Sequence, residues 1–183
     1  MAKIVNGVDV DRLVETIELI KKQPEIARFE FRARNTWIGG THNRATVKSF
    51  YGAGQEDDTR DPLVFEIDEP PVLLGENRGA NPVEYLLVAL SGCVTTSLVA
   101  HAAAKGIEIK AISSRLEGDI DLRGFLGISE SVPVGYQEIR IFFKIDADLS
   151  NKQKEELIAM GEKYSPVYNT VTKAVPVKGL LDK

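Results

Sequence analysis

The chain has 183 residues, of which 43% are hydrophobic and 27% are charged. This balance is typical of one globular domain of ordinary size, and a chain of this length can bury a core without disulfides or a structural metal. The net charge of -4 and the isoelectric point near 5.3 argue against a nucleic-acid-binding protein, which usually carries a basic face.

Cysteine and histidine are scarce. The chain has one cysteine, Cys93, and two histidines, His42 and His101. A single cysteine cannot form an internal disulfide, and the spacing of these residues does not suit zinc, so we expect no metal and no bound cofactor. The N-terminal residues lack the order of basic, apolar and small residues that marks a signal peptide. We therefore expect a protein of the reducing cytoplasm.

The first part of the chain predicts one helix and three strands. The helix is predicted from apolar residues at helical spacing, and the strands from alternating apolar and polar residues. The expected elements are a helix over 9–22 and strands over 27–38, 44–51 and 63–67. Gly39 and Gly40 predict the turn of a hairpin between the first two strands, and residues 52–61 a polar loop.

A long helix is predicted after an irregular connection at residues 68–80. Asn81 is a good N-cap, Pro82 suits the first helical position, and Glu84 can complete a capping box. Gly106 is the expected C-terminal stop. The helix would contain about 24 residues and measure roughly 36 Å.

Residues 85–104 carry no formal charge, and the segment is long enough to cross a bilayer. Its serine, threonine, glycine and histidine residues and its many alanines instead favour a helix buried on most sides by a soluble fold. We therefore expect no membrane partner.

The rest of the chain predicts two long strands and two helices. These elements are strands over 107–121 and 134–146, joined by a loop at 122–133, and helices over 151–163 and 166–173. Ser150 and Ser165 are the expected N-caps. Residues 175–177 predict an edge strand, where Pro176 would remove no interior ladder bond. The order of elements is that of an α+β fold and not of a βαβ series.

Cys93 is the first candidate for chemistry, because a thiolate is both a nucleophile and a reductant of peroxides. The middle of a helix provides no dipole charge, and His101, eight residues on, lies about 12 Å away along the axis. Any activating group must come from another segment or from another subunit. The alternative is a packing cysteine, since free cysteine is often buried as a small apolar residue.

Two segments carry a resemblance to a known family. Residues 81–93, NPVEYLLVALSGC, resemble the opening of the central helix in OsmC/Ohr-like (organic hydroperoxide resistance) proteins. Residues 165–177, SPVYNTVTKAVPV, resemble a later segment of the same family. The resemblance covers roughly residues 30–183. We therefore expect an N-terminal helical extension over residues 1–26 and an OsmC-like domain over 27–183.

The resemblance implies antiparallel strands packed around a long buried central helix, in an intertwined homodimer with its site at the subunit interface. In family members that reduce organic hydroperoxides, the central-helix cysteine attacks the peroxide and becomes a sulfenic acid. A second cysteine then forms a disulfide with it, and an arginine and a glutamate hold the first thiolate.

The sequence departs from this pattern at the second cysteine and at the glutamate. Ser165 occupies the place of the second cysteine, and Val83 that of the glutamate. Glu84 follows Val83, but it lies nine residues before Cys93, which is about 180° around a helix. We therefore expect Glu84 to cap the helix and not to act in catalysis.

The family's activating arginine sits just after the glycines of the first hairpin, where this chain has Thr41 and His42. Arg44 is the predicted substitute, and Arg78 is another; surface arginine is the alternative for each. We expect His42 to be a surface residue and His101 to be a buried, hydrogen-bonded histidine.

Two functions follow. The first is a thiol redox protein that reduces peroxides or organic hydroperoxides with Cys93 and is regenerated by an external thiol. The second is a dimer whose interface pocket binds a hydrophobic or sulfur-containing small molecule without turning it over. The retained motif around Cys93 favours the first, and the loss of the second cysteine favours the second.

Overall fold

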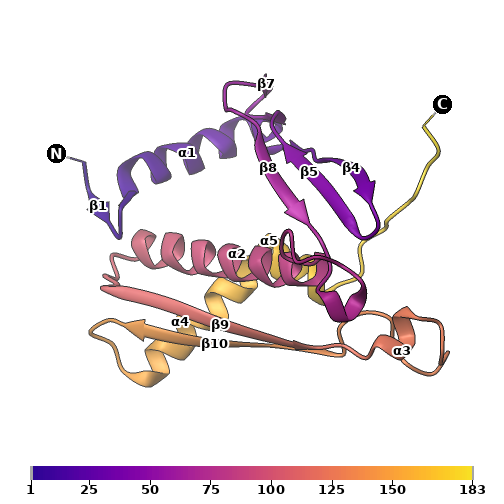
Figure 1. Cartoon of the computed structure of the whole chain (residues 1–183). Coiled ribbons are helices and arrows are strands. Elements are labelled where there is room, and N and C mark those ends of the chain that lie inside the picture. The colour runs from indigo at the N-terminus through magenta and orange to yellow at the C-terminus, as the bar shows by residue number, and fades with distance from the viewer. Residues whose placement is uncertain (1, 183) are drawn as a thin grey trace. The chain divides into compact units, whose positions relative to one another are not determined.

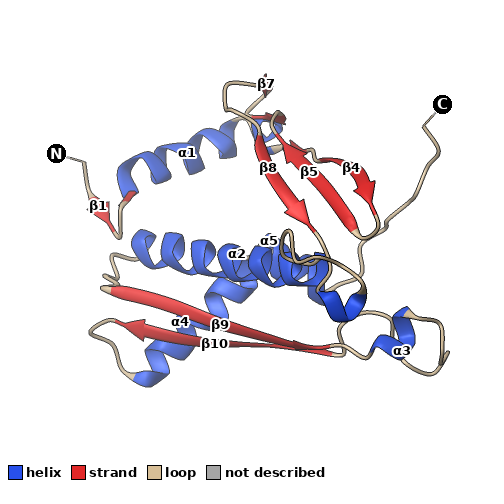
Figure 2. Cartoon of the chain, viewed as in Figure 1, coloured by secondary structure: helices blue, strands red, loops and turns tan. Residues whose placement is uncertain are grey.

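The computed structural model describes residues 2–182, which fall into two compact units. The first unit comprises Ala2 and Asp9–Leu86, and the second comprises Lys3–Val8 together with residues 87–182. Figure 1 follows the chain through both units, and Figure 2 distinguishes their helices and strands. The mixture of helices with antiparallel sheets confirms the predicted α+β class.

The first unit contains helix α1 and two antiparallel sheets. Its helical elements are α1 (Val10–Lys22) and two short 3-10 helices, η1 (Pro24–Ala27) and η2 (Pro71–Leu73). Its strands are β3 (Glu30–Phe31), β4 (Arg34–Gly39), β5 (His42–Val47), β6 (Phe50–Gly52), β7 (Gln55–Asp57) and β8 (Leu63–Ile67). The sheet orders are β3-β6-β7 and β4-β5-β8.

The predicted hairpin is divided between these two sheets. The expected strand over 27–38 is two strands, because β3 pairs with β6 whereas β4 pairs with β5. The expected polar loop at 52–61 contains a strand, β7. Ala53 and Gly54 both have positive φ, as the two central residues of a tight hairpin turn require, and this turn brings β7 back along β6.

The second unit contains most of α2, a long hairpin and three further helices. Its elements are β1 (Ile4–Val5), β9 (Ala111–Asp119), α3 (Leu122–Phe125), β10 (Glu138–Asp146), α4 (Asn151–Tyr164) and α5 (Pro166–Thr172). β2 (Val8–Asp9) pairs with β1. β9 and β10 pair in antiparallel register from Glu138 opposite Asp119 to Asp146 opposite Ala111.

Helix α2 (Pro82–Ala104) has the predicted ends. Asn81 accepts the backbone N–H of Glu84, and the Glu84 carboxylate accepts the backbone N–H of Asn81, both at 2.9 Å. At the other end Gly106 has a φ of +71°, and Ile107 N–H bonds to the carbonyl of Ala102. This is the Schellman arrangement that glycine favours. The capping role expected of Glu84 is therefore confirmed.

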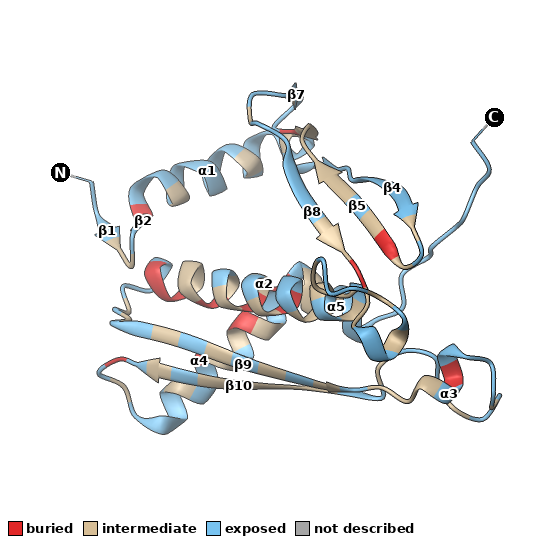
Figure 3. Cartoon of the chain, in the orientation of Figure 1, coloured by how far each residue is buried: buried red, intermediate tan, exposed pale blue. Residues whose placement is uncertain are grey.

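The buried face of α2 is a single stripe. Its fully buried members are Leu90, Val94, Leu98, Ala102 and Ala103. Leu157 of α4 joins Leu98 and Ala102 in the core, against Ile112 of β9 and Ile145 of β10. Val88 remains largely exposed in the single chain. Parts of α2 are exposed or half-buried in Figure 3, so one copy does not bury the helix on most sides. By length and composition alone, α2 could also cross a membrane.

Helix α4 approaches α2 closely because residue 161 is glycine. A Cβ at Gly161 would lie 2.9 Å from Leu98 Cβ and 3.1 Å from the carbonyl oxygen of Val94. The α4 backbone can therefore rest directly on the middle of α2, in the turn that follows Cys93.

The N- and C-terminal segments differ from the sequence expectations. Asn6 donates to the carbonyl of Ile107 at 2.9 Å and accepts from the N–H of Ile109 at 2.8 Å, which joins residues 3–8 to the second unit. The edge strand expected at 175–177 is wrong, because residues 173–182 form no helix or strand. The boundary predicted at residue 26 stays a prediction.

The capping box of α2 gives a first test. Glu84→Ala should lower the free energy of unfolding by about 1 kcal/mol, because it leaves the Asn81 N–H without its partner. Glu84→Gln should keep most of the stability, since glutamine can accept the same hydrogen bond. Urea unfolding of the three proteins measures the difference. A loss of thiol reactivity in Glu84→Gln at full stability would contradict a purely structural role.

Candidate functional site

Cys93 lies in the middle of α2, and its side chain is half-buried. One turn further on, Ser97 Oγ donates a hydrogen bond of 3.1 Å to the carbonyl of Tyr164, the last residue of α4. One helical turn is about 5.4 Å. The junction between α4 and α5 therefore lies against the same stretch of α2 that carries the thiol.

Ser165 occupies this junction and is fully buried. Its hydroxyl accepts the backbone N–H of Tyr168 at 3.1 Å, which caps α5. The capping role expected from the sequence is thus present. The residue before Ser165 is bonded to α2 at Ser97, one helical turn after Cys93.

Cys93 has no charged partner within the described part of the second unit, where no hydrogen bond or ion pair to it is found. His101 lies two turns further along α2 and stacks on Tyr164, with ring centroids 4.2 Å apart. Burial lowers the pKa of His101, and Lys105 lowers it further, so the ring is neutral at neutral pH. His101 is therefore a packed aromatic ring in this unit and not an activating cation.

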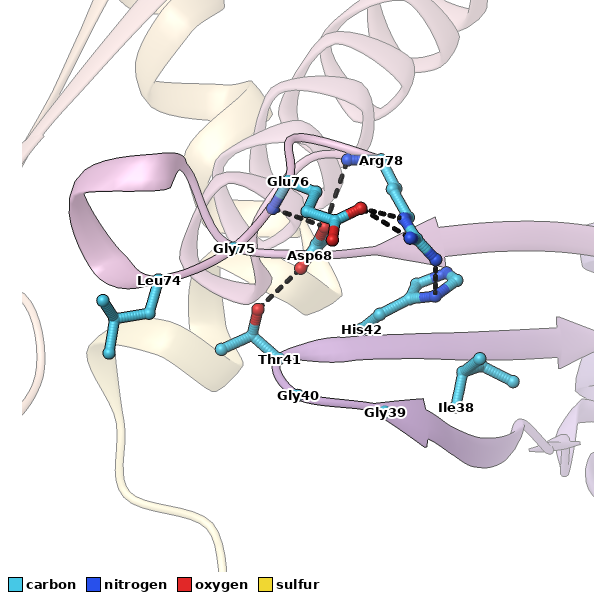
Figure 4. Close-up of a pocket in the computed structure, with 10 residues that line it drawn as sticks. All are labelled: Ile38, Gly39, Gly40, Thr41, His42, Asp68, Leu74, Gly75, Glu76 and Arg78. Carbon is cyan, nitrogen blue, oxygen red and sulfur yellow. Dashed lines mark hydrogen bonds and ion pairs between the residues drawn. The ribbon is translucent and has the colours of Figure 1, made fainter.

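A second, polar site belongs to the first unit. It is a cavity of about 250 Å³ between the β4–β5 turn and the loop that follows β8 (Figure 4). Gly39, Gly40 and Thr41 form one wall, and Gly75 and Arg78 lie on the other. The loop folds tightly onto the end of β8, since a Cβ at Gly75 would collide with the backbone of Glu69.

Asp68 holds this cavity together. It is only 2% exposed, and its carboxylate accepts the hydroxyl of Thr41 at 2.7 Å. It also accepts the backbone N–H groups of Glu69, Glu76 and Arg78, at 2.9, 3.0 and 3.3 Å. The Thr41 hydroxyl contributes most to lowering the pKa of Asp68, to about 2, and the three backbone N–H groups lower it further. One carboxylate thus joins the hairpin turn to the loop.

His42 is buried, with 8% exposure, so the expectation that it is a surface residue was wrong. Its Nε2 lies 2.6 Å from Glu66 Oε2, and its Nδ1 lies 3.2 Å from a guanidinium nitrogen of Arg78. Arginine can only donate, so Nδ1 must accept, and Nε2 must carry the ring proton and donate a hydrogen bond to Glu66. The turn places His42 where both walls of the cavity meet.

Both candidate arginines have carboxylate partners. Arg44 Nε donates to Glu66 Oε1 at 2.7 Å, and Arg44 is otherwise exposed. Arg78 donates to Glu76, at 2.5 Å from one terminal nitrogen and 3.0 Å from Nε. His42 lowers the pKa of Glu66 most, followed by Arg44. Of the two arginines, only Arg78 lines the cavity.

Metal binding has little support in residues 2–182, where no three histidine, cysteine, aspartate or glutamate side chains form a group that could hold an ion. The polar cavity of the first unit and the thiol of the second unit are the two candidate sites described above.

Comparison with known proteins identifies the fold. The family model described as OsmC-like protein matches residues 75–179, which is more than half of the 183-residue chain. The chain belongs to the OsmC-like family. This match includes α2 with Cys93 and the α4–α5 junction with Ser165.

Solved structures support the same fold for this OsmC-like protein. An OsmC-like protein from Mycoplasma pneumoniae is 18% identical, with a TM-score of 0.62 over 79% of this chain and 89% of that chain. An organic hydroperoxide resistance protein from Elizabethkingia anophelis, with thiocyanate bound, is 19% identical, with a TM-score of 0.56 over 79% and 89%. No curated protein matched the chain.

A third structure is described as an organic hydroperoxide resistance protein OsmC, predicted redox protein, from Legionella pneumophila. It is 17% identical, with a TM-score of 0.56 over 78% of this chain and 88% of that chain. At these sequence identities the structural similarity establishes the fold alone.

Sequence reasoning missed the role of Asp68 in this OsmC-like protein. Asp68 follows a predicted strand and precedes two prolines, and this pattern predicted no more than an irregular connection. An aspartate at a strand end, before a loop rich in glycine, was the available signal, because such loops need an acceptor for their unpaired N–H groups.

The Asp68 carboxylate gives a second test. Asp68→Ala should destabilise the first unit and increase amide exchange in residues 69–78, because several buried donors lose their acceptor. The folded-state pKa is below the usual 3.8, so the stabilisation is complete above about pH 4 and is lost as the pH falls towards 2. Amide exchange by mass spectrometry across this range measures both effects. Unchanged exchange in Asp68→Ala would show that the loop is held by other contacts.

Proposed function

We propose that this protein is a thiol redox protein in which Cys93 reduces an organic hydroperoxide and an external thiol restores it. The observation that supports this most is the position of Cys93, half-buried on α2 beside the α4–α5 junction. Membership in the OsmC-like family and solved relatives named for organic hydroperoxide resistance support it further. The reducing cytoplasm would supply the thiol.

In the first step, the Cys93 thiolate attacks the outer oxygen of the hydroperoxide. The S–O bond forms as the O–O bond breaks, and the alkoxide leaves and takes a proton as the alcohol. Cys93 becomes a sulfenic acid. A small thiol then attacks this sulfur and water leaves, giving a mixed disulfide, and a second thiol molecule releases Cys93 as the thiol.

No second cysteine of the chain can take part in this cycle, since Cys93 is the only one. Peroxide without added thiol should therefore leave Cys93 as sulfenic acid, which over-oxidises to sulfinic acid in excess peroxide. Added small thiol should trap the mixed disulfide. Intact-mass spectrometry distinguishes these products, with Cys93→Ser as the control. Retention of the free thiol under excess organic hydroperoxide would rule out the peroxidase.

A cation near the thiolate would speed the first step by lowering the thiol pKa. Arg44 stays our candidate from the sequence, and Arg78 is the alternative that lines the first unit's cavity. The oxidation rate of Cys93 in Arg44→Met and in Arg78→Met decides between them in the same assay. Equal rates in the wild type and both variants would mean that neither arginine activates Cys93.

Ser165→Cys tests the geometry of the thiol site. If the α4–α5 junction faces Cys93 as the hydrogen bond from Ser97 suggests, peroxide should produce a disulfide between residues 93 and 165. The reduced variant should be less stable by about 1 kcal/mol, because a thiol is a poor N-cap for α5. Peptide mapping identifies the bridge. Oxidation of residue 93 without a bridge would place the two side chains apart.

We propose further that the protein acts as an intertwined homodimer. The support is the amount of apolar surface that one copy leaves exposed, including Phe31 at 73% and Trp37 at 68%. Val88 on α2 is also uncovered. Patches of this kind usually mark an interface.

Sedimentation at low micromolar concentration should show a single dimeric species, because burial of these side chains outweighs the cost of association. A folded monomer under the same conditions would contradict the dimer.

The second candidate function is binding of a hydrophobic small molecule without turnover. It is favoured by Val83 and Ser165, which stand where the hydroperoxidases of the family have glutamate and cysteine. It becomes the preferred function if Cys93 proves unreactive in the oxidation experiment.

A further inference from the structure

A partly open cavity of about 160 Å³ lies on the second unit, beside α2. Its apolar walls are Leu90 of α2, Ile139 and Ile141 of β10, and Val171 of α5. An apolar cavity of about 150 Å³ admits a single benzene molecule, so the volume suits one small ring.

Polar side chains border the same cavity. Glu162, near the end of α4, and Tyr168, in α5, both line the cavity. Each is only partly exposed. Within residues 2–182, neither the Glu162 carboxyl nor the Tyr168 hydroxyl makes a side-chain hydrogen bond or ion pair, although both backbones do. Half-buried polar groups of this kind are normally satisfied by a partner or by water.

We propose that this cavity binds a small amphiphilic ammonium compound, with its apolar body against Leu90 and the β10 isoleucines and its charged nitrogen at Glu162 and Tyr168. The ammonium group has three donors and no acceptor. The Glu162 carboxylate and the Tyr168 oxygen are both able to accept from it.

Charge decides the ligand class. A carboxylate ligand would meet the charge of the partly buried Glu162, and like charges repel each other at short range. A neutral alcohol would gain only an uncharged hydrogen bond, which is roughly half as strong as a charge-assisted one. Burial raises the pKa of the Glu162 carboxyl, and burial together with Glu162 raises the pKa of the Tyr168 phenol. A cation supplies the countercharge that this corner of the cavity lacks.

The site does not depend on redox chemistry. Leu90 precedes Cys93 by three residues, about 4.5 Å along the helix, but Cys93 is not among the residues that line the cavity. Cys93→Ser should therefore bind the ammonium compound like the wild type, and this arm separates the present proposal from the peroxidase.

Binding is measured by calorimetry and by NMR shifts of the Ile139 and Ile141 methyl groups, with benzylamine, benzyl alcohol and benzoate as probes. Benzylamine and benzyl alcohol have the same ring and differ in charge. The wild type should bind benzylamine at least about tenfold more tightly than benzyl alcohol, and benzoate least. Affinity for benzylamine should fall as the pH falls through the raised pKa of Glu162, because protonation removes the carboxylate.

Glu162→Gln keeps the size and shape of the side chain, and it should reduce the preference for benzylamine over benzyl alcohol to about one. Glu155→Gln makes the same chemical change at an exposed position of α4 and should leave the preference unchanged. Tyr168→Phe should weaken benzylamine binding by a few fold through loss of one acceptor. Thermal unfolding of each variant verifies that it is folded.

Three results would overturn the proposal. One is the absence of saturable benzylamine binding to the folded wild type at millimolar concentrations. Another is equal binding of benzylamine and benzyl alcohol. The last is a preference for benzylamine that survives in Glu162→Gln, which would place the cation elsewhere.

Discussion

Helix α2 imposes the main constraint on this structure, because it is long, apolar and nearly uncharged. Its single charged side chain, Glu84, is used at the first turn to cap the backbone. The remaining turns must be covered by other elements, and one stripe is covered within the chain by α4 and the β9–β10 hairpin. Gly161 allows the closest approach, since any side chain at that position would collide with Leu98. Most features of the second unit follow from this requirement.

The same constraint determines what Cys93 can do. In the middle of a helix the backbone N–H groups are all bonded, so the thiol receives no help from α2 itself. What the fold provides instead is a neighbour: the α4–α5 junction, fixed by the Ser97–Tyr164 hydrogen bond. In this chain the junction carries a buried serine that serves as a helix cap. The proposed redox chemistry at Cys93 therefore needs an external thiol. It also needs an activating cation, which the described contacts of the second unit do not include.

The first unit shows how a single carboxylate can organise a site. Asp68 closes the connection between β8 and α2 by accepting one hydroxyl and three backbone N–H groups. The loop it holds carries Arg78, and the turn it holds carries His42, so the Arg78 guanidinium and the His42 ring meet at the cavity. The loop also has backbone hydrogen bonds of its own, from Gly75 N–H to the carbonyl of Pro70 and from Asn77 N–H to that of Glu69.

Local sequence signals described the helices and the long strands well. Asn81, Glu84 and Gly106 each carry a backbone preference that acts within a few residues, and α2 begins and ends where they predict. Ser150 and Ser165 likewise cap α4 and α5, as their sequence positions predict. The sequence could not predict that the first hairpin is divided between two sheets. Alternation determines which face of a sheet a side chain lies on, but not which strand its own strand pairs with.

The candidate sites show the same difference between local signals and long-range packing. The sequence by itself determined the class of fold, the long helix with Cys93 and the capping roles of Glu84 and Ser165. Only the tertiary structure decided that His42 is buried between Glu66 and Arg78, and that Glu162 and Tyr168 line one cavity. Those pairs are separated by 24, 36 and 6 positions in the sequence, and their meeting depends on how whole elements pack, which no local propensity encodes.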